Sequence, residues 1–297
     1  MIPVRHSDSS GRRSGAVLTA AFLLALPAFA AAQSGTLELA DARIYYESAG
    51  QGTAVVFIHG WALNLREWDD QVAALVPRSR VVAFDRRGYG KSTGHADISA
   101  DAGDLRALLD TLGIGKAVLV GHSAGAGVVY RFAAAFPDRT AGLVLYGGGA
   151  PLGFPIARST PRPNLREIAR RFGLDSLLKF VLAQPGFSDL RTPAIQARIN
   201  AMWATYTGKD LLEDHAQSGR FPLPHVDEVK RWTIPTLFLV GDGEAPYARL
   251  IGDSLARWMP NARSVVVPGG GHGVHFQQPE RFNAALLGFL MEVSKNR

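Results

Sequence analysis

Short runs of consecutive apolar residues recur along the chain and alternate with stretches in which apolar residues stand three or four positions apart. Six such runs occur, at residues 54–58, 81–84, 117–120, 143–146, 236–240 and 264–267. Runs of this length are typical of strands buried on both faces, and the wider spacing is typical of helices with one buried face. The alternation predicts an α/β fold, with a mostly parallel twisted sheet that helices cover on both faces.

Two features modify this plan. Residues 36–39 and 43–46 flank a short Ala-Asp-Ala link and predict an antiparallel pair at the edge of the sheet. The alternation stops after residue 149 and resumes at residue 233, so about 80 residues separate two strands of one sheet. We expect a helical cap there, over a cleft, because helix signals fill this stretch.

Three signals define the cap helices. Asn164 stands three residues before Glu167, which is typical of a helix start, and Gly173 is typical of a helix end. The apolar residues of this helix would then face inward, namely Leu165, Ile168, Ala169 and Phe172, and a second helix would follow. Thr192 before Pro193 predicts the start of a third helix. The predicted domains are a signal peptide (1–32), a first part of the core (33–150), the cap (151–232) and a second part of the core (233–297).

Residues 1–32 have the layout of a secretory signal peptide. Three arginines precede an apolar stretch at residues 16–30, and small residues follow it. The stretch is shorter than the roughly 20 residues that span a bilayer, and Pro27 lies inside it, so we expect no stable membrane insertion after cleavage. The Arg12-Arg13 pair leaves both the general and the twin-arginine export routes open. The sequence predicts a periplasmic or secreted protein.

Composition narrows the chemistry. The chain has no Cys, which excludes disulfides, thiolate zinc sites and a cysteine nucleophile. The formal net charge is +6, but the basic residues are scattered, so we expect no nucleic-acid partner. Arg86 and Arg87 beside Asp85 leave two interpretations open, an anion site or structural support of the sheet, and the second is favoured.

Residues 121–125 read Gly-His-Ser-Ala-Gly and lie between an apolar strand and a helical pattern. This placement is typical of a sharp turn that exposes a serine hydroxyl at the carboxyl end of a sheet. A serine needs an oriented base, and His272 follows the last predicted strand on a Gly-rich loop. Ser123 is the candidate nucleophile and His272 the candidate base. Because His272 must be neutral to accept a proton, activity should fall below roughly pH 6 to 7.

Two secondary questions concern the same segment. His272 and His275 form a His-x-x-His pair, but the Gly-rich loop is not expected to be helical and carries no accompanying Glu, so we predict no metal and a structural role for His275. The acid of the site should follow another strand, where Asp242 and Glu244 both stand.

Several segments together resemble the α/β-hydrolase superfamily, in its cap-bearing esterase, haloperoxidase-like and C–C hydrolase branch. The resemblance spans residues 36–296 and rests on residues 59–61 (His-Gly-Trp), 85–92, 121–125, 241–244, 271–272 and 278–280. It implies that Glu244 is the acid, although Asp is the usual occupant, with Asp242 as the alternative. It also implies that the backbone N–H groups of Trp61 and Ala124 form the oxyanion hole.

The predicted function is therefore that of a secreted or periplasmic serine hydrolase. It would cleave a small to medium carboxylic ester through a Ser-His-Glu triad and an acyl-enzyme, without a cofactor. Three alternatives use the same triad, namely C–C bond hydrolysis, lactone hydrolysis and perhydrolysis. A ligand-binding protein without turnover is a fourth. Whether Met202, Trp203 and Phe180 line an acyl pocket or pack the cap on itself is open, as are the natural substrate and the oligomeric state.

Overall fold

The computed structural model describes Met1 and residues 32–155, 163–184, 187, 190 and 192–295. The predicted signal peptide thus lies almost entirely outside the described residues. Among the helices that are described, none combines the length and the apolar character needed to cross a membrane.

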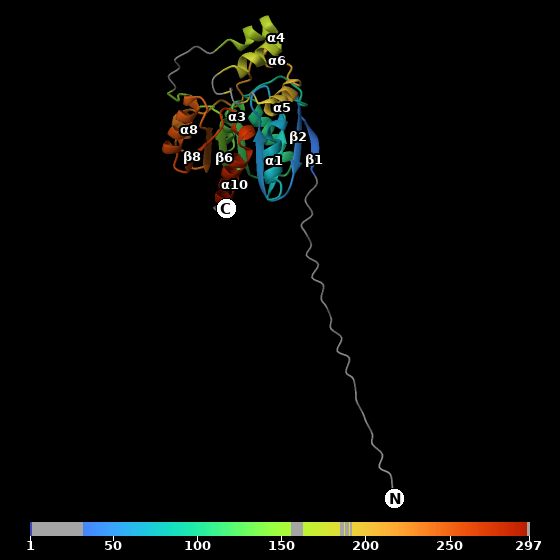
Figure 1. The fold of residues 1–297 in the computed structure, drawn as a ribbon, viewed down its shortest axis with the longest axis vertical. Helices are drawn as coiled ribbons and strands as arrows, with labels where there is room; N and C mark the ends of the chain where they lie inside the picture. Colours follow the sequence, from blue (N-terminus) through green and yellow to red (C-terminus); the bar gives the residue numbers. More distant parts are fainter. Residues whose placement is uncertain (2–31, 156–162, 185–186, 188–189, 191, 296–297) are drawn as a thin grey trace.

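The centre of the molecule is an eight-stranded sheet with the strand order β1-β2-β4-β3-β5-β6-β7-β8 (Figure 1). Its strands are β1 (Gln33–Glu38), β2 (Arg43–Ala49), β3 (Thr53–Ile58), β4 (Ser79–Phe84), β5 (Ala117–His122), β6 (Thr140–Tyr146), β7 (Thr236–Gly241) and β8 (Ala262–Val267). β2 pairs antiparallel with both β1 and β4, and the remaining neighbours are parallel. The predicted strands and the edge hairpin are confirmed, and the carboxyl ends of the parallel strands share one edge.

Helices cover both faces of this sheet. One face packs against α2 (Asp101–Thr111), α3 (Ala124–Ala135) and α8 (Pro246–Trp258), and the other against η1 (Leu65–Trp68), α1 (Asp69–Leu75) and α10 (Pro279–Lys295). Consecutive strand residues divide between the two faces: Val56 and Leu119 join the first core, and Val55 and Val118 the second. This division explains why the strands are continuous apolar runs rather than alternating ones. The α/β fold class is therefore confirmed.

Between β6 and β7, the described residues form the helices α4 (Leu165–Leu182), α5 (Pro193–Trp203), α6 (Lys209–Leu212) and α7 (Val226–Val229). In Figure 1, the helices α4, α5 and α6 lie together above one edge of the sheet. Asn164 caps α4 by accepting a hydrogen bond from the Glu167 N–H (3.1 Å), and Gly173, with φ of 81°, kinks the helix. The expectation that Phe172 faces inward is wrong, because 61% of it is exposed just before that kink.

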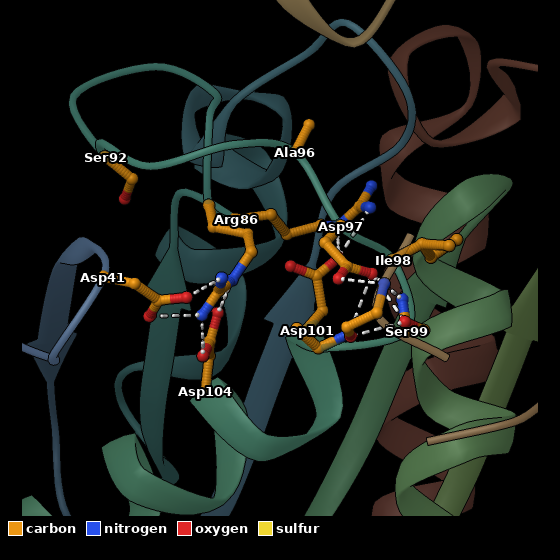
Figure 2. Close-up of polar contacts among 12 residues, drawn as sticks. Asp41, Arg86, Ser92, Ala96, Asp97, Ile98, Ser99, Asp101 and Asp104 are labelled. Atoms are coloured by element: carbon orange, nitrogen blue, oxygen red, sulfur yellow. Dashed lines mark hydrogen bonds and ion pairs between the residues drawn. The ribbon is translucent and has the colours of Figure 1, made fainter. Parts of the chain in front are cut away.

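Buried ion pairs fix the loop after β4. Arg86 contacts Asp101 at 2.7 Å, and Arg87 contacts Asp104 at 2.6 Å and Asp41 at 3.0 Å. Figure 2 labels Arg86 together with the acidic partners of both arginines, Asp101 and Asp104 from α2 and Asp41 from the turn between β1 and β2. Since carboxylates of the same chain already neutralise both guanidinium groups, their arrangement supports the structural interpretation over an anion site.

Candidate active site

Ser123 occupies a strained turn between β5 and α3. Its φ of 52° lies in the left-handed region, which residues other than glycine rarely adopt. A Cβ on Gly121 would come within 2.6 Å of the Gly125 carbonyl oxygen, and a Cβ on Gly125 would collide with the Ile58 carbonyl. Both glycines are therefore needed for β5, α3 and β3 to approach one another. The turn is held by the Ser123 N–H, which donates to the Tyr146 carbonyl at 2.9 Å.

His272 and Glu244 meet at the same edge of the sheet. His272 follows β8, Glu244 follows β7, and the imidazole Nδ1 lies 3.0 Å from Glu244 Oε2 and 3.2 Å from Oε1. Both side chains are buried. Burial alone would raise the pKa of Glu244, but the hydrogen bond and the charge of His272 outweigh it and hold the pKa below its ordinary value. A charged Glu244 that accepts the Nδ1–H leaves Nε2 of His272 as the basic nitrogen.

Asp242 takes a different position. Its Oδ1 accepts hydrogen bonds from the backbone N–H groups of Gly269 at 2.9 Å and Gly270 at 3.2 Å, and its side chain is exposed. These bonds hold the loop that leads to His272 and lower the pKa of Asp242. Of the two candidate acids, Glu244 is the one in contact with the imidazole.

Ser123 and His272 line one pocket, which has a volume of about 100 Å³. The contacts of the described residues include no hydrogen bond between Ser123 Oγ and His272 Nε2. The observation that places these two side chains close to each other is that both line the same pocket. The rest of the lining is mostly aliphatic and aromatic and comes largely from the cap: Leu63, Leu178, Val181, Leu182, Phe187, Leu190, Ile199, Trp203 and Phe276. The sequence left open whether Met202, Trp203 and Phe180 line an acyl pocket. Of these, Trp203 lines this pocket, and Met202 is buried beside it in the cap core.

The two predicted oxyanion donors follow neighbouring strands. Trp61 comes shortly after β3 and lines the pocket, and Ala124 begins α3 directly after Ser123. The N–H of a first helical residue has no acceptor within its own helix, which leaves that of Ala124 available. The Trp61 indole Nε1–H donates to Asp210 of α6 at 2.7 Å, so the side chain of Trp61 is also fixed to α6.

Glu67, His122 and His275 form a second polar cluster beside the pocket, which the sequence patterns did not reveal. Glu67 lies on η1, and His275 lies on the short helix α9 (Val274–Gln277), which begins directly after the non-helical Gly-rich loop. Glu67 Oε1 contacts His122 Nδ1 and lies 3.2 Å from His275 Nε2. One carboxylate and two imidazoles are also a donor set that metals use, and their ligand atoms lie within 4.8 Å of one another. His272 and His275, in contrast, contact different carboxylates.

A family model described as the alpha/beta hydrolase family matches residues 55–285. A non-heme haloperoxidase of Rhodococcus erythropolis is 32% identical over 278 residues, which cover 88% of this chain and 98% of that relative.

Solved structures give the same result. A thermophilic esterase from Thermogutta terrifontis superposes with a TM-score of 0.73 at 29% identity, covering 88% of this chain and 99% of the other. Est816, described as an N-acyl homoserine lactone degrading enzyme, superposes with a TM-score of 0.70 at 25% identity and covers 86% and 100%.

Proposed function

This chain belongs to the alpha/beta hydrolase family, and we propose that within it the protein is a serine hydrolase that cleaves small, uncharged carboxylic esters. The observation that carries the proposal is the direct contact between His272 Nδ1 and Glu244, together with a pocket that both His272 and Ser123 line. The strained turn at Ser123 adds to it, because strain of this kind persists where the surrounding structure enforces it and is concentrated at functional sites.

The chemistry would proceed in two steps. Ser123 Oγ attacks the ester carbonyl carbon while His272 Nε2 takes the hydroxyl proton, and the tetrahedral species then expels the alcohol, which receives that proton. His272 next takes a proton from water, whose oxygen attacks the acyl-enzyme. The second tetrahedral species then expels Ser123 Oγ, which receives that proton from His272, and the acid is released. Glu244 holds the ring orientation and stabilises the imidazolium in both steps.

Negative charge develops on the former carbonyl oxygen in each tetrahedral species. The backbone N–H groups of Trp61 and Ala124 would stabilise it, and Ala124 adds the positive end of the α3 dipole. Each such donor contributes roughly 10²- to 10³-fold in rate.

The lining of the pocket supports a substrate with a short apolar acyl group. Among the described residues that line it, only His122 and His272 carry titratable side chains, and the volume of about 100 Å³ is small for a ligand pocket. A charged acyl group would lose its hydration there without gaining an opposite charge.

Labelling with a fluorophosphonate tests the proposal. We expect the parent protein to react covalently and Ser123→Ala to be unreactive, with p-nitrophenyl acetate and butyrate cleaved faster than the decanoate. Failure of the folded parent to label would favour a ligand-binding protein without turnover.

Lactone hydrolysis and perhydrolysis stay as second candidates, because the similar proteins include a lactone-degrading enzyme and a haloperoxidase. Together with C–C bond hydrolysis they would use the same three side chains and differ in the shape of the pocket. Rates on a matched panel of esters, lactones, diketones and acetate with peroxide would rank these reactions, and a lactone or diketone preferred over every ester would replace the proposal.

Export is part of the same proposal, supported by the sequence layout of residues 1–32. Expression of the full chain in a Gram-negative host should yield a periplasmic protein whose N-terminus lies near residue 31 or 33. An uncleaved cytoplasmic product would contradict it.

A further inference from the structure

Glu67 is fully buried at the centre of the second polar cluster. Its Oε1 faces both His122 and His275, and neither His122 nor His275 is exposed by more than a few per cent. Within the described part of the chain, Glu67 Oε1, His122 Nδ1 and His275 Nε2 have no other partner. Burial alone would raise the pKa of Glu67, but the two imidazoles outweigh it and hold the pKa far below its ordinary value, so the carboxylate is charged.

The outer atoms of this cluster reach both halves of the candidate active site. Glu67 Oε2 accepts a hydrogen bond from the Gly60 N–H at 2.8 Å, next to the proposed oxyanion donor of Trp61. On the other side, His122 Nε2 lies 3.0 Å from the backbone carbonyl oxygen of His272. A carbonyl oxygen only accepts, so His122 Nε2 carries the proton in this contact.

A second path leads from Glu67 to the same carbonyl. The Tyr146 hydroxyl donates to the His272 carbonyl oxygen, and His275 Nδ1 lies 3.1 Å from that hydroxyl. The His272 carbonyl therefore accepts two hydrogen bonds from side chains that both lead back to Glu67. The rings of His122 and Tyr146 stack with centroids 4.6 Å apart, which restricts the movement of either one.

The three side chains contact one another directly. Glu67 Oε1 is 3.2 Å from His275 Nε2 and also contacts His122 Nδ1.

We propose that Glu67 is a positioning residue that holds the base, His272, and the turn that carries Trp61 in the correct relative position. It would act on the backbone of His272 through His122 and through His275 with Tyr146, and on Trp61 through Gly60. The inference rests on the proposed function. Its physical basis is that acyl transfer needs Ser123, the base and the oxyanion donors aligned to within a fraction of an ångström, and a misplacement of 1 Å costs about 10²-fold.

Glu67→Gln tests this inference, because it keeps an acceptor for the Gly60 N–H but removes the charge between the two imidazoles. We expect the kcat for p-nitrophenyl acetate and the rate of fluorophosphonate labelling to fall about 10²-fold, with KM within about twofold. The matched control is Asp104→Asn, which removes a buried carboxylate from the Arg87 pair away from the pocket. It should lower the melting temperature while leaving the labelling rate of the folded protein unchanged.

Tyr146→Phe provides the second arm and serves alone if Glu67→Gln does not fold. It removes one donor to the His272 carbonyl and keeps the ring, so kcat should fall about tenfold with KM little changed, since one arm of the network remains. If both residues act on His272 through one network, the loss in the double variant will be smaller than the product of the single losses.

Three results would overturn the inference. The first is a parental kcat in Glu67→Gln, and the second is fully multiplicative losses in the double variant. The third is a stoichiometric metal in the purified parent that Glu67→Gln removes. If the parent itself does not label, the proposed function fails and the inference fails with it, so the two failures are distinguishable by the parent alone.

Discussion

Two carboxylate–imidazole systems lie side by side in this molecule and meet at His272. The first includes the His272 side chain, and the second contacts its backbone carbonyl oxygen. In the first, Glu244 contacts His272 Nδ1 and leaves Nε2 at the wall of a pocket that Ser123 also lines. In the second, Glu67, His122 and His275 contact one another, and every ring nitrogen faces another atom of the protein. The chemical groups are the same. His122 lines the same pocket, so what separates the systems is the free nitrogen: His272 Nε2 has no hydrogen-bond partner among the contacts of the described residues, whereas both ring nitrogens of His122 and of His275 face protein atoms.

The largest expected effect comes from removing the accessible imidazole. His272→Gln should lower kcat about 10⁶-fold, because the base and its orientation are lost together and the residual rate comes from binding and the oxyanion hole. His275→Gln is the matched variant in the buried system and should cost at most about 10²-fold. Steady-state hydrolysis of p-nitrophenyl acetate measures both. Equal losses in the two variants would remove the distinction between the systems.

Glu244→Gln sharpens the comparison at the level of the carboxylates. An amide cannot stabilise the imidazolium and can favour the wrong tautomer of His272, so kcat should fall about 10⁴-fold. Glu67→Gln is expected to cost about 100 times less, since Glu67 acts only on the backbone of the base. A smaller loss for Glu244→Gln than for Glu67→Gln would exchange the roles assigned to the two carboxylates.

The sequence predicted these two systems unequally. Gly-x-Ser-x-Gly and the segment around His272 are local patterns, and the strands before them are apolar runs that buried parallel strands require, so the positions of Ser123 and His272 followed from neighbouring residues. Glu67 stands between Arg66 and Trp68 on η1 and carries no local pattern. Its partners are distant in the chain and are brought together only by the order of the strands in the sheet.

One error in the prediction, and one choice that the residues alone left open, have a physical cause as well. Phe172 has helical spacing that suggests an inward face, and Leu165, Ile168 and Ala169 of that face do pack in a core, but Phe172 itself stands directly before the kink at Gly173 and is exposed. The choice between Asp242 and Glu244 required the resemblance to a family, because both follow β7 and the sequence does not say which side chain turns toward His272. The structure shows that contact for Glu244.

Lowering the pH should reduce the free energy of unfolding through the buried imidazoles, and urea unfolding measures this change. Burial lowers the pKa of His275 to about 4, and burial together with the charge of Arg86 lowers the pKa of His59 to about 3, while both are about 6.5 when unfolded. The folded state therefore binds fewer protons, so the stability that these groups contribute is full above pH 6.5 and is lost as pH falls through this window.

Each of these two imidazoles should cost about 1.4 kcal/mol of unfolding free energy per pH unit between pH 6.5 and 4. The lowered pKa values of Glu67 and Glu244 act in the same direction below their unfolded values. His275→Gln should give a shallower dependence on pH than the parent. Identical slopes for the two proteins would show that His275 is already protonated in the folded state.

Asp242→Asn is expected to have the smallest effect, and it separates orientation of the imidazole from support of its loop. Asn keeps an amide oxygen that can accept from the Gly269 and Gly270 N–H groups, and Asp242 does not contact His272. Activity on p-nitrophenyl acetate should therefore stay within about threefold of the parent. A loss comparable to that of Glu244→Gln would move the acid of the accessible system to Asp242, and Glu244 would then join Glu67 as a carboxylate that only supports the geometry of the base.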